Sequence, residues 1–172
     1  MPVDGYRQES VFQHNLNRRG AGLWMARNDR GFTIPDGVAS DIVILSKQGR
    51  EVLLIERKND PTGFALPGGF LDPNETLLEC AVRELREETS LTVSKEQLTL
   101  VGVYSDPNRD PRARIISVAY VCSVEDEVLN RAASGDDAKG LKVVAVADIL
   151  QDKVRTVFDH KQIITEAVKM VL

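Results

Sequence analysis

The sequence has little of several features that mark particular classes of protein. Its two cysteines, Cys80 and Cys122, are too few for a disulfide framework, and their spacing does not match a zinc site. No apolar run approaches the roughly 18–20 residues that a membrane-spanning helix needs. The first ten residues, MPVDGYRQES, are polar and include acids, which argues against a secretory signal. We therefore expect a cytoplasmic protein that makes no contact with a membrane.

An excess of basic residues is also missing. Lysine and arginine total 22 against 26 acidic residues, so the formal net charge is −4. A nucleic-acid-binding domain usually carries a basic stripe, so we expect no nucleic-acid partner. A small polyanionic substrate is still allowed, because a bound cation can invert the local electrostatics. The length of 172 residues, with 42% hydrophobic residues, fits one globular domain.

Apolar and β-branched runs predict a sheet over most of the chain that follows residue 34. The predicted strands cover residues 38–45, 51–57, 98–104, 115–124 and 141–146, with a strand end and tight loop over 64–70. A turn at residues 47–50 makes the first two strands a hairpin, and residues 147–150 form a short turn. Helical spacing predicts helices over residues 74–89 and 158–171. The pattern predicts one mixed α/β domain over residues 35–172, preceded by an N-terminal extension over residues 1–34.

The predicted helix over residues 74–89 divides into three faces. Asp72, Pro73 and Glu75 match a helix start, with a capping side chain, a proline at the first helical position and a glutamate three residues after the cap. At roughly 100° per residue, one face is apolar and faces the core. The solvent face holds Glu75, Glu79, Arg83 and Arg86, and the third face holds Glu84, Glu87 and Glu88.

The third face is the informative one, because like charges three and four residues apart each destabilise a helix by roughly 0.2–0.5 kcal/mol. Three converging carboxylates suit Mg²⁺, a hard cation that binds carboxylate oxygens and bridges phosphates. A solvated acidic face relieved by neighbouring arginines explains the helix equally well on its own. Gly68 and Gly69 favour the metal, because glycine lets the main chain approach a ligand closely. The Gly68 carbonyl is then a candidate metal ligand.

Gly69, Glu75 and residues 83–91 (RELREETSL) together resemble the Nudix box, whose pattern is G-x5-E-x7-R-E-U-x-E-E-x-G-U with U aliphatic. The final glycine is the one departure, since Ser90 stands there. The resemblance extends from about Val38 to the C-terminus. It implies an α/β/α sandwich with a mixed sheet and a loop–helix–loop catalytic motif. It also implies Mg²⁺ as the cofactor, with Mn²⁺ as a substitute.

The resemblance also implies roles for single residues. Glu84, Glu87 and Glu88 would hold the metal, and Glu84 would also be a candidate base. Arg83 would pair with Glu75 and brace the loop against the helix. Ser90 would take a left-handed backbone, at a cost on the order of 1 kcal/mol.

A second candidate base lies far from the box. Asp137 follows Gly135 and Asp136 in a loop, and the base in this family often comes from outside the box. A polar Gly-Asp turn explains these residues equally well.

The loop at residues 104–112 points to the substrate. Arg109 and Arg112 suit bidentate phosphate contact, and Tyr104 suits stacking on a base. Without the family, a hairpin loop in which Asp110 neutralises the arginines is the simpler interpretation. The R-D-P-R loop and the later Phe158-Asp159-His160 are similar to the ADP-ribose pyrophosphatase branch of the family. Ala113 departs from the glycine usual in that branch.

The resemblance implies hydrolysis of the pyrophosphate bond in a nucleoside diphosphate derivative. The foremost candidate is a small nucleotide-sugar, ADP-ribose, which would give AMP and ribose 5-phosphate. The alternatives are NADH, a dinucleoside polyphosphate or an oxidised nucleoside triphosphate, and a non-catalytic ADP-ribose-sensing domain. The intact box acids favour catalysis. The branch and the extension at residues 1–34, a candidate dimer contact, suggest a homodimer.

Overall fold

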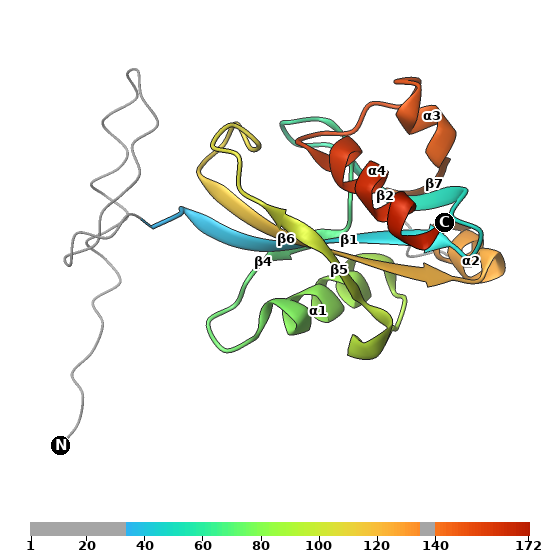
Figure 1. Ribbon diagram of the computed structural model, residues 1–172, viewed down its shortest axis with the longest axis horizontal. Helices are drawn as coiled ribbons and strands as arrows, with labels where there is room; N and C mark the ends of the chain where they lie inside the picture. Colours follow the sequence, from blue (N-terminus) through green and yellow to red (C-terminus); the bar gives the residue numbers. More distant parts are fainter. Residues whose placement is uncertain (1–33, 135–139) are drawn as a thin grey trace.

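A computed structural model describes residues 34–134 and 140–172 of the chain (Figure 1). One seven-stranded mixed sheet runs in the order β3-β2-β1-β6-β5, with β4 also on β1 and β7 also on β2. The strands are β1 (Gly37–Ser46), β2 (Glu51–Arg57), β3 (Gly63–Ala65), β4 (Gly68–Phe70), β5 (Thr99–Tyr104), β6 (Ile115–Val124) and β7 (Leu141–Ala145). The helices are α1 (Leu77–Thr89), α2 (Asp126–Ser134), α3 (Val146–Leu150) and α4 (His160–Val171), with a 3₁₀ turn η1 (Lys95–Gln97).

The sheet is buried on both faces, and β1 shows why. Successive side chains of a strand point to opposite faces, so an apolar run such as β1 supplies two cores at once. Ile42 and Ile44 pack on one face with residues of α1 and α2: Ala81, Leu85 and Leu129. Val43 and Leu45 pack on the other face with residues of α3 and α4: Ile149, Ile163 and Ile164. Figure 1 shows α1 on one side of the sheet and α3 and α4 on the other, which confirms the predicted α/β/α sandwich.

Strand β1 changes its partner partway along its length. It runs parallel to β6 throughout, but its other edge pairs first with β4, at Asp41 opposite Gly68, and later with β2, at Ile44 opposite Leu53. Between these two pairings the Ile42 amide donates to the Pro67 carbonyl at 2.8 Å. The predicted hairpin of β1 and β2 is confirmed. The divergence of β2 from β4 leaves room beside β1, and the cavity described below lies there.

Three short elements differ from the expectation. Residues 146–150 form helix α3 rather than a turn, because Val146 and Ile149 one helical turn apart are both buried. Neither η1 nor α2 was predicted. Helix α2 is only 9 residues long, and its one fully buried apolar residue, Leu129, gives little periodic signal. No helix in the described part of the chain is long and apolar enough to cross a membrane.

Helix α1 begins later than predicted. Its N-cap is Thr76, whose side chain accepts from the Glu79 amide while the Glu79 carboxylate accepts from the Thr76 amide. Asp72 and Glu75 instead form a turn ahead of the helix, in which the Asp72 amide donates to the Glu75 carboxylate at 2.8 Å. The stretch holds two capping signatures, and only the second, at Thr76, begins the helix. At the other end Ser90 has φ 58°, which confirms the predicted left-handed geometry.

Candidate active site

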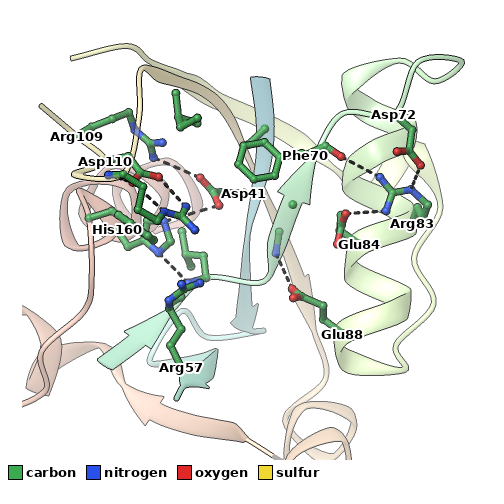
Figure 2. Close-up of a pocket in the computed structure, with 18 residues that line it drawn as sticks. Asp41, Arg57, Phe70, Asp72, Arg83, Glu84, Glu88, Arg109, Asp110 and His160 are labelled. Atoms are coloured by element: carbon green, nitrogen blue, oxygen red, sulfur yellow. Dashed lines mark hydrogen bonds and ion pairs between the residues drawn. The ribbon is translucent and has the colours of Figure 1, made fainter. Parts of the chain in front are cut away.

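A cavity of about 480 Å³ lies between α1 and the loops that precede β6 and α4. Figure 2 shows two sets of charged side chains facing each other across it. The acidic wall consists of Glu84 and Glu88 on α1, and the arginine wall consists of Arg57, Arg109 and Arg112. A cavity with an acidic wall opposite an arginine wall suits an anionic ligand that binds together with a cation.

The box glycine, Gly69, lies directly against the acidic wall. A Cβ atom added at Gly69 would stand 2.2 Å from Oε1 of Glu84, closer than any side chain tolerates. Glycine is therefore required for the Glu84 carboxylate to rest on the loop backbone. Gly68 is similarly restricted, because a Cβ there would lie 2.3 Å from the Ser40 carbonyl oxygen. These two close approaches fix β4 against β1 on one side and α1 on the other.

Arg83 ties that loop to the helix. Its guanidinium donates to both Glu75 oxygens, at 3.0 and 2.6 Å, and to the Phe70 carbonyl at 3.1 Å. It also reaches Glu84 at 2.6 Å. The Glu75–Arg83 contact that the resemblance implied is present, and it lowers the pKa of Glu75 to about 2. Both residues were placed on the solvent face of the helix, which was wrong, because Glu75 precedes α1 and draws Arg83 over the loop.

Glu88 is the carboxylate of the cavity that lacks a cationic partner among the described residues. One of its oxygens accepts the Gly68 amide at 2.8 Å, and no arginine or lysine reaches it. Desolvation within the cavity is the main reason that the pKa of Glu88 is raised to about 7; the neighbouring Glu84 and Asp41 charges act in the same direction, and the Gly68 amide acts against them. A carboxylate in this setting is stabilised by a cation placed beside it.

The donor set fits Mg²⁺. Among the described residues no three acidic, histidine or cysteine side chains converge into a ready cage. Mg²⁺ does not need one, since it is usually held by one or two carboxylates, several waters and substrate phosphates. Glu84, Glu88 and Gly68 all line the cavity and can supply such a partial shell. Glu87 does not line it, and its side chain is 60% exposed beside Arg83.

The structure separates the two arginines of the R-D-P-R loop. Arg109 is buried, with 4% of its side chain exposed, and donates twice to Asp159 at 2.8 and 2.7 Å. Arg112 has 43% of its side chain exposed and donates twice to Asp110 at 3.0 and 2.7 Å. Arg109 therefore joins the loop to the start of α4, whereas Arg112 keeps a solvent-facing edge in the cavity.

Tyr104 lies away from the cavity. Its ring belongs to the core beneath α4, where 7% of the residue is exposed, and its hydroxyl donates to Glu166 at 2.6 Å. In this conformation the ring cannot stack on a substrate base, contrary to the expectation. The aromatic rings that do line the cavity belong to Phe70 and Phe158, and Phe70 is 50% exposed. The other candidate base, Asp137, lies outside the described residues.

Asp41 is a functional candidate that the sequence interpretation passed over. It accepts the Ser117 hydroxyl, and Arg109 stands 3.4 Å from the same oxygen. A single acid inside the apolar run of β1 was the available signal, since an isolated charge is costly to bury without partners. Arg57 gave no such signal, because an arginine at the end of a strand is ordinary.

His160 links the same network to the glycine loop. Its Nδ1 atom accepts the Leu66 amide at 2.9 Å, and its Nε2 atom lies 3.7 Å from Asp41. The residue is 3% exposed, and desolvation lowers the pKa of the imidazole. The neutral ring with a proton on Nε2 satisfies this geometry. His160 thus holds the backbone just before Gly68.

Comparison with known proteins identifies the family of this chain. The family model of the NUDIX domain matches residues 35–166, so the chain belongs to the Nudix family. The protein is a Nudix pyrophosphohydrolase, in a family whose hydrolases generally use divalent metals.

Three known proteins show which members of the family this chain is similar to. An ADP-ribose pyrophosphatase of Methanocaldococcus jannaschii is 40% identical over 131 residues, covering 75% of this chain and 71% of the relative. A mutT/nudix family protein from Listeria innocua has 34% identity and a TM-score of 0.67, over 80% of this chain and 95% of that one. A Francisella tularensis bifunctional NMN adenylyltransferase/ADP ribose pyrophosphatase, solved with AMP and a Mn ion, has 28% identity and a TM-score of 0.62. That match covers 80% of this chain and 42% of the Francisella chain.

Proposed function

We propose that this cavity hydrolyses ADP-ribose to AMP and ribose 5-phosphate in the presence of Mg²⁺, with Mn²⁺ as a substitute. The observation that carries the proposal is the unpartnered Glu88 on the acidic wall, facing an arginine wall across one cavity. A diphosphate with its cation neutralises both walls at once. The named activity of the Methanocaldococcus relative supports ADP-ribose as the substrate. The cavity volume of about 480 Å³ lies within the usual range for small-molecule sites.

We assign the following roles to the residues of the cavity. Glu84, Glu88 and the Gly68 carbonyl would hold Mg²⁺, with Glu87 available only at the rim. When bound, Mg²⁺ neutralises charge on the diphosphate and favours ionisation of water. Arg83 and Glu75 keep the loop fixed, so the ligands need not reorganise during the reaction.

In this proposal one of two carboxylates accepts the proton of the attacking water. Glu84 is positioned in the cavity, where Arg83 contacts it at 2.6 Å. Asp137 is the alternative. Arg112, with its exposed edge in the cavity, is assigned to the substrate, and Arg109 is assigned to holding the loop.

The test is to incubate the protein with ADP-ribose and Mg²⁺ and to identify the products by mass. The proposal expects AMP and ribose 5-phosphate, loss of both when the metal is chelated, and recovery when Mg²⁺ is restored. A protein that leaves ADP-ribose intact but cleaves NADH, a dinucleoside polyphosphate or an oxidised nucleoside triphosphate would assign the cavity to that substrate instead. A protein that binds ADP-ribose and cleaves nothing would be a sensing domain.

A further inference from the structure

Most arginines of the cavity are already neutralised by the protein. Arg83 pairs with Glu75 and Glu84, Arg109 pairs with Asp159, and Arg112 pairs with Asp110. A paired guanidinium has part of its hydrogen-bonding capacity occupied before any ligand arrives. Arg57 is different, because it forms no ion pair with any of the residues that the structure describes.

Arg57 is nevertheless held in place. Its Nε atom donates to the Pro61 carbonyl at 3.0 Å, which leaves the two terminal nitrogens of the guanidinium available. Figure 2 shows the side chain reaching from β2 into the cavity, on the opposite side from Glu88. The charge is close enough to oppose the rise in the pKa of Glu88. One unpaired cation and one unpaired anion therefore face the same space without meeting.

The ring of Phe158 supports this arrangement. The guanidinium carbon of Arg57 lies 5.5 Å from the ring centroid, and that of Arg112 lies 5.0 Å from it. Phe158 has φ 55°, a left-handed backbone that is unusual for a bulky side chain. Strained residues persist where the surroundings over-determine them, and they gather at functional sites. Here the next residues, Asp159 and His160, are fixed by Arg109 and Leu66, and Phe158 itself lines the cavity.

We propose that Arg57, backed by the Phe158 ring, is an anion-binding residue of the cavity in addition to Arg112 and holds a phosphate group of the substrate opposite the acidic wall. A guanidinium with its terminal nitrogens free matches two phosphate oxygens at once. The inference rests on the proposed function only in that the substrate carries a diphosphate. It does not depend on the ribose or the base.

Inorganic pyrophosphate is the probe that isolates this interaction. Binding is measured by calorimetry on the full chain, with EDTA present so that no metal contributes. The variants are Arg57→Ala and, as a matched control, Arg114→Ala. Arg114 also donates to one backbone carbonyl, at Ser105, but it does not line the cavity. Both variants lose the same charge from the protein, so only the loss of a local contact distinguishes them.

We expect Arg57→Ala to weaken pyrophosphate binding by roughly tenfold to a hundredfold, the range for loss of a charge-assisted contact. Arg114→Ala is expected to bind as the wild type does. Arg57→Lys, which keeps the charge but not the planar fork, is expected to fall between the two. Phe158→Leu, which removes the aromatic face, is expected to weaken binding less than Arg57→Ala does.

The inference is overturned if wild type binds pyrophosphate no better than Arg57→Ala does, including the case in which neither binds. Thermal unfolding of each variant checks that it is folded, and Arg57→Gln replaces the alanine variant if that one is not. A wild type that leaves ADP-ribose intact but binds pyrophosphate through Arg57 would refute the proposed substrate and leave this inference standing.

Discussion

Among the described carboxylates, Glu88 is the one whose pKa is raised by its environment. Desolvation and two neighbouring carboxylates raise its pKa to about 7, so in the metal-free protein its ionised form opposes folding at neutral pH and above. We expect Glu88→Gln to lower kcat by at least about a hundredfold at saturating Mg²⁺, since a charge and a ligand are lost together. The metal-free variant should be at least as stable as the wild type. Steady-state kinetics and thermal unfolding with EDTA measure the two effects.

Glu87→Gln is the matched control for that prediction, because Glu87 lies on the same helix but outside the cavity. We expect it to retain activity within about tenfold, as a residue that touches the metal shell at most through water. If Glu88→Gln keeps activity within a few-fold, or if Glu87→Gln is the more damaging change, the acidic wall has been assigned to the wrong carboxylates.

Arg109 and Arg112 lie three residues apart in the sequence, and replacing each by alanine should have different effects on stability and activity. Removing Arg109 leaves Asp159 and Asp41 without their buried partner, so we expect a loss of roughly 3–5 kcal/mol in the free energy of unfolding. Arg112 is half exposed, so Arg112→Ala should change stability by less than about 1 kcal/mol. That variant should instead lose roughly ten- to hundredfold in kcat/KM for ADP-ribose. Denaturant unfolding and kinetics on both variants would show the opposite pattern if the roles were reversed.

At the level of the element, the end of α1 carries a local cost. Ser90 adopts φ 58°, where a residue with a Cβ is disfavoured and glycine is not. We expect Ser90→Gly to stabilise the protein by about 1 kcal/mol, with kcat/KM unchanged because the side chain lies outside the cavity. Ser90→Ala keeps the Cβ and serves as the control. Equal denaturation midpoints for the glycine and alanine variants would remove strain as the explanation.

The start of α4 holds the glycine loop through His160. Its pKa is lowered below 6.5 by desolvation and by the Arg109 and Arg57 charges, against the opposing pull of Asp41 and Asp159. The unfolded chain therefore binds the proton first, so the stability that His160 provides is present above pH 6.5 and is lost as the pH falls through the folded pKa. Protonation also converts the Nδ1 acceptor into a donor and breaks the bond to the Leu66 amide.

We expect His160→Gln to flatten the dependence of stability on pH below 6.5, because glutamine keeps an acceptor and does not titrate. His160→Ala should cost roughly 1–3 kcal/mol at pH 8, the penalty for a buried amide without a partner. Unfolding curves at several pH values measure both. A His160→Gln variant with the wild-type slope between pH 6.5 and 5 would show that another group sets this dependence.

Local sequence patterns predicted the helices and strands that have strong periodicity. They failed where tertiary contacts determine where an element begins or which residues meet in the site. The bounds of β2 and β6 were predicted to the residue, because alternating and β-branched runs are local signals. The start of α1 was misplaced because Asp72 and Glu75 form a turn ahead of the helix, in which Glu75 also binds Arg83, eight residues away. In the site, box residues could be found by spacing alone. Asp41 and Phe158 gave partial signals and Arg57 gave none, and spacing could not bring the three together, because they meet in the cavity only after β1 changes partner and α4 docks.

On the scale of the whole molecule, the two layers of helices supply opposite halves of the site. Helix α1 on one face of the sheet carries the acidic wall, and the start of α4 on the other face holds Arg109 and His160 (Figure 1). The two halves meet where the pairing partner of β1 changes from β4 to β2, and the sheet topology determines this position. Contacts from both faces of the sheet therefore hold the site, which suits electrostatic preorganisation around a diphosphate.

Internal competition between substrates measures which of them this preorganised cavity prefers. ADP-ribose, NADH, a diadenosine polyphosphate and an oxidised nucleoside triphosphate are mixed at equal concentration with the wild type and Mg²⁺, and each is followed by mass. Relative rates of consumption in one vessel give the ratios of kcat/KM. We expect ADP-ribose to disappear at least about tenfold faster than the others, with AMP and ribose 5-phosphate as products. Prior consumption of any competitor, or no consumption of ADP-ribose, would contradict the account.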